Sequence, residues 1–198
     1  SPAAALIAKL MGSASATFFY MHPILKRGGS QKAIPWHQDL PYWKVEGKQI
    51  GSVWIALDDM PMHASVQYLQ GSHAWGLFRP RHFADHSSYE GRDDLPEMPD
   101  VDAMLRAGAT RALTFEVRAG DALCFDARIV HGSPGNPEAP GSDHRRVALR
   151  FGGDDATYCN RSGETAIPTP EVDSSHGLQH GDALACKAFP QVWPPPSD

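Results

Sequence analysis

The sequence predicts a mainly β domain of the jelly-roll, sandwich or barrel type. Its 18 glycines and 17 prolines are spread along the 198 residues, a pattern typical of many short elements joined by turns. About seven or eight short stretches have strand character, and no helical layer separates them. A chain of this length can bury its own core but is too short for two independent domains. We therefore expect a single domain over residues 1–198, with its core at about residues 18–158.

The first elements follow from local composition. Residues 1–13 are alanine-rich and predict one short helix, which Gly12 ends. Residues 15–25 predict a strand that the polar segment KRGGS stops. A second strand is expected over about residues 49–57, closed by an acidic turn. The segment SVQYLQGSHAWG predicts a shorter strand that leads into a turn.

Residues 77–109, which we call the excursion, are polar and lack a clear period apart from one helical turn near DVDAMLRAG. Loops of this length in compact domains usually act as lids or binding loops. Strand character returns at RALTFEV, and after a turn at Gly120 one long strand is expected through DALCFDARIVHGS. The segment RRVALRFGG predicts one more strand. The tail, residues 159–198, is expected to be irregular because its prolines cannot continue regular structure.

Composition argues against several functional classes. The net charge of −5 comes from scattered charges of both signs, so nucleic acid is not expected as a partner. Apolar runs fall well short of the roughly 18 residues that a membrane span needs. The three cysteines form no CxxC pair, which argues against a disulfide framework or a thiolate zinc site and suits the cytoplasm. We expect a monomer or homodimer that acts on a small molecule.

The segment IPWHQDLPYW carries the first candidate chemistry. In an extended strand His37 and Asp39 project to the same side while Gln38 points away. A neutral imidazole and an ionised carboxylate can hold one metal ion but need a third ligand. The best candidate is His131, which ends an apolar strand. Two histidines and one carboxylate are typical of non-haem Fe(II) oxygenases. A surface turn at His37 and a satisfied core histidine at His131 remain the simpler alternatives.

Several linked segments resemble, in order, the landmarks of the phytanoyl-CoA dioxygenase family of Fe(II)- and 2-oxoglutarate-dependent oxygenases. The resemblance covers about residues 18–158 and rests on these segments: PWHQDLPYW, SVWIALDDMP, QGSHAWG, RAGDALCFDARIVHGSPGN and RRVALRFGGDD. It implies a double-stranded β-helix, or jelly roll, with a few flanking helices and long loops. It also implies His37, Asp39 and His131 as catalytic iron ligands, 2-oxoglutarate as co-substrate and O2 as oxidant.

In this family an arginine shortly after the distal histidine binds the distal carboxylate of the co-substrate, for which a guanidinium offers a bidentate fork. Arg145, Arg146 and Arg150 compete for this role. We favour Arg146, because it shares a face with Ala148 and so resembles the family pattern of an arginine followed by small residues. Arg145 is the second choice. The alternative that all three arginines solvate a sheet edge stays open.

Other positions also match the family. Ser133 would donate its hydroxyl to the same carboxylate, and Trp54 would form a wall of the co-substrate pocket, although a core aromatic is the alternative. Trp36, Tyr42 and Trp43 flank the metal motif and are interpreted as substrate-side residues or, equally, as core aromatics.

The segment Gly71–His73 is interpreted as a structural turn. The other histidines are expected in solvated loops, including His63, His82, His86, His144, His176 and His180. Arg79, Arg81, His82 and Arg92 of the excursion could bind an acidic group, but a solvated loop face is the simpler interpretation.

The resemblance implies hydroxylation, or another oxidation, of an unactivated C–H bond of a small molecule, with release of succinate and CO2. Asp39 favours hydroxylation, because related halogenases lack this carboxylate and bind chloride in its place. Two alternatives remain: a cupin-like hydrolase or isomerase that uses zinc or manganese, and an inactive jelly-roll binding module. An arginine near His131 favours the oxygenase. The excursion and the tail are expected to determine the substrate, and residues outside this sequence to add contacts, since the resemblance begins within a family member's N-terminal region.

Overall fold

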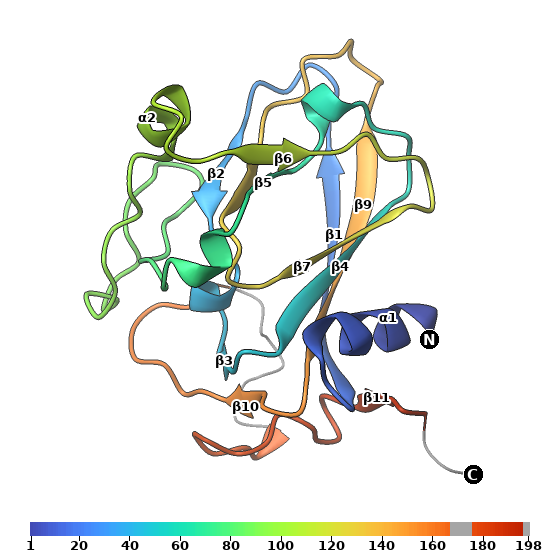
Figure 1. Cartoon of the computed structure of the whole chain (residues 1–198), viewed down its shortest axis with the longest axis vertical. Helices are drawn as coiled ribbons and strands as arrows, with labels where there is room; N and C mark the ends of the chain where they lie inside the picture. Colours follow the sequence, from blue (N-terminus) through green and yellow to red (C-terminus); the bar gives the residue numbers. More distant parts are fainter. Residues whose placement is uncertain (167–175, 196–198) are drawn as a thin grey trace.

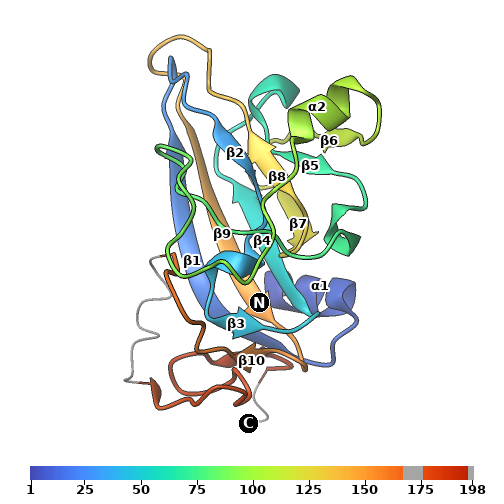
Figure 2. The ribbon, with the colours of Figure 1, turned by 90° about the vertical axis from the view of Figure 1, so that its left-hand side faces the viewer.

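Two antiparallel β-sheets face each other in the computed structural model, which describes residues 1–166 and 176–195. Figure 1 shows the longest strands of the larger sheet running roughly along the long axis of the molecule, and Figure 2, turned by 90°, separates the two layers. The expected mainly β jelly roll is confirmed. Among the described residues no helix has the length and apolar character needed to cross a membrane.

The larger sheet has five strands in the order β11, β1, β9, β4 and β7. Their bounds are Gln191–Trp193, Ala16–Lys26, His144–Gly152, Ile50–Ala56 and Ala122–Asp126, respectively. Strand β9 lies at the centre, between β1 and β4. Because side chains alternate along a strand, His144, Arg146 and Arg150 are buried on one face of β9, while Arg145 is exposed on the other.

The smaller sheet has four strands in the order β2, β8, β5 and β6, with bounds Ile34–His37, His131–Ser133, Gln67–Leu69 and Ala112–Thr114. Strands β3 (Val45–Glu46) and β10 (Thr157–Tyr158) pair at the lower end of the molecule (Figure 1). Apolar side chains from both sheets fill the space between them, including Trp54 and Ala148 from the larger sheet and Tyr68 from the smaller one. The sheets are therefore joined by a shared core.

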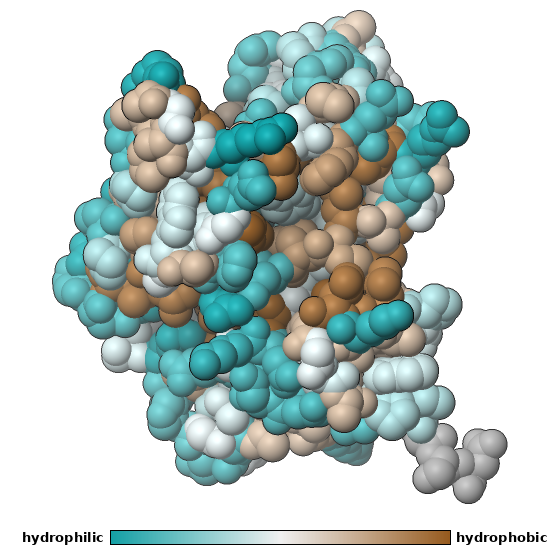
Figure 3. All heavy atoms as spheres, in the orientation of Figure 1, coloured by the Kyte–Doolittle hydropathy of each residue, from teal (hydrophilic) through white to brown (hydrophobic). Residues whose placement is uncertain are grey.

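In the part of the chain that the structure describes, two α-helices flank the sheets. Helix α1 (Pro2–Met11) ends at Gly12, whose φ of 65° is the left-handed conformation that glycine adopts without strain. The helix packs on the outer face of the larger sheet, against residues such as Phe151. Around and above α1, Figure 3 shows apolar side chains reaching the surface. Helix α2 (Val101–Arg106) begins at Asp100, whose carboxylate accepts a hydrogen bond from an amide in the first turn. It is the helical turn expected within the excursion.

Among the described residues, three 3-10 turns lie at Leu40–Tyr42, Met62–Ala64 and Ser72–Ala74. The last of them follows Gly71, which has a φ of 76°. The Ser72 hydroxyl donates to the Leu69 carbonyl (2.9 Å) and accepts from the Val130 amide (2.8 Å). The GSH segment is thus a turn that supports the neighbouring strands, as expected.

The prediction of one long strand through residues 121–133 is wrong, because the structure has two strands there. Strand β7 ends at Asp126, and β8 begins at His131 in the other sheet. The Asp126 carboxylate accepts a hydrogen bond from the Arg128 amide (2.8 Å), and the Asp126 carbonyl accepts one from the Ile129 amide (3.0 Å). An aspartate that bonds the backbone two residues on favours a turn. This turn carries the chain from one sheet to the other.

The expectation of an irregular tail is also wrong in part. Strand β11 pairs with the start of β1, with Trp193 opposite Ala16. The chain has a short proline-free stretch between Pro190 and Pro194, and it is this stretch that joins the edge of the sheet. Residues 167–175 and 196–198 of the tail lie outside the described residues.

Candidate metal centre

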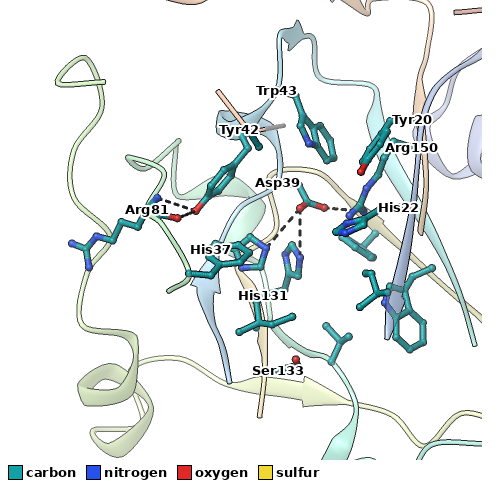
Figure 4. Close-up of a pocket in the computed structure, with 18 of the residues that line it drawn as sticks. Tyr20, His22, His37, Asp39, Tyr42, Trp43, Arg81, His131, Ser133 and Arg150 are labelled. Atoms are coloured by element: carbon teal, nitrogen blue, oxygen red, sulfur yellow. Dashed lines mark hydrogen bonds and ion pairs between the residues drawn. The ribbon is translucent and has the colours of Figure 1, made fainter. Parts of the chain in front are cut away.

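Three side chains predicted as metal ligands meet between the two sheets. His37 ends β2 and His131 begins β8, and these residues are directly opposite each other in the antiparallel pair. Their ring centroids are 4.2 Å apart. The Asp39 Oδ1 atom lies 3.7 Å from His37 Nε2 and 3.9 Å from His131 Nε2 (Figure 4). All three residues are buried.

The backbone reason for this arrangement differs from the expected one. Asp39 does not continue an extended strand, because its φ of −72° and ψ of −44° are helical. It begins the 3-10 turn at Leu40, whose amide donates to the Ala127 carbonyl (3.0 Å). Gln38 points away, as expected, and its amide group bonds the Gly76 and Arg128 carbonyls. A turn that is held on both sides therefore directs Asp39 toward the histidines.

Backbone carbonyls fix the orientation of both imidazoles. His37 Nδ1 lies 2.8 Å from the Pro35 carbonyl oxygen, and His131 Nδ1 lies 3.0 Å from the Ile129 carbonyl oxygen. A carbonyl can only accept, so each Nδ1 must carry the hydrogen. The lone pair of each neutral ring is then on Nε2, the atom that faces Asp39. Hydrogen bonds of this kind typically fix the tautomer of histidines that bind metals.

Burial and charge favour the protonation states that metal binding needs. Burial, followed by the neighbouring His131, lowers the pKa of His37 to about 3. Burial also lowers the pKa of His131. Burial alone would raise the pKa of Asp39, but Arg150 and the two imidazoles outweigh it and hold that pKa below its usual value. At neutral pH the site thus has two neutral imidazoles and one carboxylate.

The donor set fits a divalent transition-metal ion. One ligand atom from each of His37, Asp39 and His131 lies within 4.8 Å of the other two, and no other such trio of His, Cys, Asp or Glu occurs within the described residues. Imidazole and carboxylate together suit iron, and ligands gathered on one side leave the opposite positions open. The arrangement can therefore hold a metal ion that still binds other molecules.

A cavity of about 330 Å³ contains the three ligands. Figure 4 shows Ser133 at one end of the cavity and Tyr42 and Trp43 toward the other. Arg146 and Trp54, which also line the cavity, stack on each other, and Lys26 interacts with both Ser133 and Arg146. The lining of the cavity is richer in apolar than in polar surface. The cavity therefore offers two spaces, one on each side of the ligand cluster.

The three competing arginines of β9 have different surroundings. Arg145 is exposed and forms an ion pair with Asp58 (2.6 Å). Arg146 is 2% exposed, lines the cavity and lies over the Trp54 ring, 5.3 Å from its centroid. Its Nε atom is buried without a hydrogen-bond partner among the described residues. Arg150 Nη1 lies 2.9 Å from Asp39 Oδ2. Arg146 alone of the three keeps its charge free for a bound anion.

Sequence reasoning missed Lys26. This residue ends β1, and its ammonium group donates to the Ser133 hydroxyl (2.7 Å) and to the Pro134 carbonyl. Burial, and then the nearby Arg146, lower its pKa to about 8. Lys26 is separated from the metal motif by a polar turn, and only the pairing of β1 with β9 brings it near Arg146. No local sequence signal could have identified it.

The three flanking aromatics divide into two groups. Tyr42 and Trp43 line the cavity that holds the ligands. Trp36 does not: it packs with residues of the excursion, and its indole N–H donates to Asp102 (3.0 Å). Trp36 instead borders a second hollow beside the excursion. Trp36 thus lies outside the cavity that holds the three ligands, and its contact with a substrate stays a prediction.

The excursion covers the cavity. The Tyr42 hydroxyl donates to the Arg81 carbonyl (2.8 Å) and accepts from the Arg81 amide (2.9 Å). Phe83 lies against His37, with ring centroids 4.7 Å apart. Arg92 was expected to be solvated, but it is 1% exposed and donates to the Pro41 carbonyl (2.7 Å). The excursion is thus attached at two points to residues 39–42, which we call the metal loop.

His144 is a further correction, since a solvated loop was expected. It is 4% exposed, because β9 begins there and turns the ring inward, two positions before Arg146. Its Nε2 atom lies 3.5 Å from Glu138, which also lies 3.5 Å from the exposed His63. His144 lies at the boundary between a loop and a strand, where the sequence does not predict whether a side chain is buried.

The phytanoyl-CoA dioxygenase (PhyH) family model matches residues 2–146, more than half of the chain and a span that includes His37, Asp39, His131 and Arg146. The chain belongs to the phytanoyl-CoA dioxygenase family. Among curated proteins, this family member is 32% identical to ectoine dioxygenase of Nocardia farcinica (strain IFM 10152) over 112 residues. That match covers 51% of this chain and 36% of the relative, so the chain spans little more than a third of the relative's length.

Solved structures similar to this PhyH-family chain support the fold. The non-haem α-ketoglutarate-dependent carbocyclase SnoK from nogalamycin biosynthesis gives a TM-score of 0.66 at 23% identity, covering 94% of this chain and 66% of SnoK. The epimerase SnoN gives a TM-score of 0.63 at 20% identity, covering 94% of this chain and 66% of SnoN. EvdO2 from Micromonospora carbonacea var. aurantiaca, complexed with 2-oxoglutarate, gives a TM-score of 0.57 at 23% identity. This match covers 84% of this chain and 62% of EvdO2. These likenesses place the chain in the fold of such enzymes.

Proposed function

We propose that the protein is an Fe(II)- and 2-oxoglutarate-dependent dioxygenase that hydroxylates, or otherwise oxidises, a C–H bond of a small molecule. The observation that carries this proposal is the cluster of His37, Asp39 and His131, with both Nε2 lone pairs turned toward the carboxylate. Membership of the PhyH family supports it. When bound, iron and 2-oxoglutarate supply the oxidising power, since conversion of the keto acid to succinate and CO2 accompanies transfer of one oxygen atom of O2 to the substrate.

The residues at the Trp54 end of the cavity suit the co-substrate. Arg146 is buried, retains an unpartnered Nε and has a flat aromatic surface beneath it. A guanidinium binds a carboxylate through two parallel hydrogen bonds, which an ammonium cannot match. We assign the distal carboxylate to Arg146, with the Ser133 hydroxyl and the Lys26 ammonium beside it. Trp54 forms the wall along which the carbon chain lies.

The residues at the other end suit the substrate. Tyr42, Trp43 and Phe83 line that part of the cavity and exclude water from the metal side. A dry site limits side reactions of a strong oxidant. We assign the substrate to this space, beneath the excursion, while Trp36 contributes only through the packing of the excursion.

The test is anaerobic absorption spectroscopy of the purified protein. Fe(II) with 2-oxoglutarate is expected to give the weak visible charge-transfer band of the chelate, and the Asp39→Ala variant is expected to lose it. A screen of candidate metabolites for coupled succinate release, with products heavier by one oxygen atom, then identifies the substrate. Tight zinc binding that is indifferent to 2-oxoglutarate would instead indicate a cupin-like hydrolase, and the absence of metal binding would indicate a binding module.

A further inference from the structure

A buried arginine contacts the carboxylate of the metal cluster on the side away from the histidines. Arg150 Nη1 lies 2.9 Å from Asp39 Oδ2, while Oδ1 is the atom that faces His37 and His131. Figure 4 shows the guanidinium reaching Asp39 from the direction of Tyr20 and His22. The two oxygens of one carboxylate therefore have different neighbours.

The position of Arg150 is fixed on several sides. It lies on the central strand β9, opposite Ser52 of β4, and Nη1 also donates to the Ser52 hydroxyl. Its guanidinium lies over the Trp43 ring at 5.1 Å and over the Phe125 ring at 5.9 Å from the centroids. Contacts with aromatic faces and strand neighbours reduce the freedom of this side chain. Arg150 is a rigid partner for Asp39.

Asp39 depends on this partner. Arg150 forms an ion pair with Oδ2, and this buried oxygen accepts no hydrogen bond from the described residues. A free carboxylate has two equivalent oxygens and can bind a metal ion through one or through both. A guanidinium on Oδ2 removes this equivalence and leaves Oδ1 for the metal.

We propose that Arg150 is a positioning residue that restricts Asp39 to one-oxygen binding of the metal ion. The consequence concerns the open positions opposite the triad. A carboxylate that bound through both oxygens would occupy a position needed by the chelating co-substrate or by O2. By holding Oδ2, Arg150 keeps that position available and aligns Oδ1 before the metal arrives.

Arg146 serves a different purpose on the same strand. It is four residues from Arg150, a separation of about 13 Å along an extended strand, and Ala148 lies between them. The two buried arginines thus act at opposite parts of the cavity. This inference rests on the proposed function only in requiring that a divalent metal ion binds the triad.

The test measures metal binding without turnover, with Co²⁺ as the probe and absorption spectroscopy as the readout. The variants are Arg150→Met, the conservative Arg150→Lys, and the milder Ser52→Ala, which removes a support of Arg150. Arg145→Met is the matched control, because Arg145 lies on the same strand but is exposed and contacts Asp58. Thermal unfolding of every variant identifies any that fails to fold.

We expect Arg150→Met to bind Co²⁺ about 10- to 100-fold more weakly, the usual effect of losing a partner of a metal ligand. Arg150→Lys should recover part of the affinity, Ser52→Ala should lose less, and Arg145→Met should match the unchanged protein. Azide, a small anion that binds metal ions, probes the open position of the metal. In the unchanged protein with 2-oxoglutarate bound, this position stays free, so azide should still alter the Co²⁺ spectrum. In Arg150→Met both Asp39 oxygens can bind the metal, so azide should compete with 2-oxoglutarate.

Folded Arg150→Met and Ser52→Ala variants with unchanged Co²⁺ affinity and unchanged azide response would overturn the inference. Such a result would leave the proposed function intact. If the unchanged protein itself does not bind Co²⁺, the proposed function fails first, so the two failures are distinguishable.

Discussion

His37 and His131 face each other across one pair of antiparallel strands, with ring centroids 4.2 Å apart. The two ligands are far apart in the sequence, but the strand pairing sets the distance between them in space. Between them in the sequence lie five strands and the whole excursion, none of which needs to change that distance. The geometry of the metal centre is therefore protected from variation in the loops.

Gly132 makes this pairing possible. A Cβ atom at this position would lie 2.9 Å from the Ile34 carbonyl oxygen, closer than such contacts normally allow. We expect Gly132→Ala to push β2 away from β8 and to destabilise the fold by about 1–3 kcal/mol, the usual range for overpacking. Denaturant unfolding and Co²⁺ titration measure both effects. The control is Gln67→Ala, opposite Gly132 on β5, and equal stability of the two variants would contradict the expected clash.

Metal binding should stabilise the folded protein. At a free metal concentration about 100 times the dissociation constant, linkage predicts about 2.7 kcal/mol, which corresponds to roughly 5–10 °C in Tm for a chain of this size. Differential scanning fluorimetry with Mn²⁺, and again after chelation, measures the shift. The Asp39→Ala variant should show none, and an equal shift in that variant would place the metal elsewhere.

Arg146 and Arg145 provide a matched pair for co-substrate binding. Losing hydrogen bonds to a charged group costs about 1.5–3 kcal/mol, so Arg146→Met should weaken 2-oxoglutarate binding roughly 10- to 150-fold. Arg145→Met should have no effect, since Arg145 is exposed on the opposite face. Isothermal titration of the Mn²⁺ protein without O2 measures both. Equal affinities in the two variants would remove Arg146 from the assignment.

Lys26 should make co-substrate binding depend on pH. Burial, and then Arg146, lower its pKa from 10.5 to about 8, so Lys26 is charged below about pH 8 and neutral above it. The charged form attracts a carboxylate, and the affinity for 2-oxoglutarate should fall as the pH rises through about 8. The effect of pH on folding stability runs in the opposite direction. Between about pH 8 and 10.5 Lys26 is protonated in the unfolded chain but neutral in the folded one, so its contribution makes folding more favourable as the pH rises.

The measurement is the dissociation constant of 2-oxoglutarate between pH 7 and 9, in the unchanged protein and in Lys26→Met. The variant should bind more weakly at pH 7 and show a flatter profile. Parallel profiles would mean that another group is responsible.

Tyr42 controls the attachment of the excursion. Its hydroxyl exchanges two hydrogen bonds with the backbone of Arg81. We expect Tyr42→Phe to leave the Arg81 amide and carbonyl unpaired at a cost of about 1–3 kcal/mol and to loosen residues 81–89. Hydrogen exchange should increase there, while Co²⁺ affinity stays unchanged. Uniform protection in the variant would show that the packing of Phe83 on His37 is sufficient.

Much of the fold could be predicted because local signals agreed with tertiary structure. The alanine-rich start with Gly12, the strand before KRGGS and the helical turn after Asp100 all formed where expected. The prediction of one strand through residues 121–133 failed because apolar character continues across Asp126, where hydrogen bonds to its carboxylate and carbonyl make a turn. An apolar run does not reveal that its two halves belong to different sheets.

The candidate site was predicted in its ligands but not in its surroundings. His37, Asp39 and His131 are recognisable from residue type and order, and they meet in the structure. The preference for Arg146 over Arg145 rests on the family pattern along one strand face and stays a prediction. Lys26 and the buried state of Arg92 depend on contacts between distant segments. Trp36 was assigned by proximity in sequence, yet its side chain turns toward Asp102. Sequence neighbours of a ligand need not share its cavity.

The Arg92 guanidinium connects the middle of the excursion to the carbonyl of Pro41, two residues after Asp39. The loop segments on either side of this contact can change in length and sequence while the contact keeps the metal loop in place. Substitutions meant to change substrate preference can therefore be placed in the excursion on either side of Arg92 without removing this contact. A replacement for the excursion taken from another protein should therefore keep an arginine at the position of Arg92.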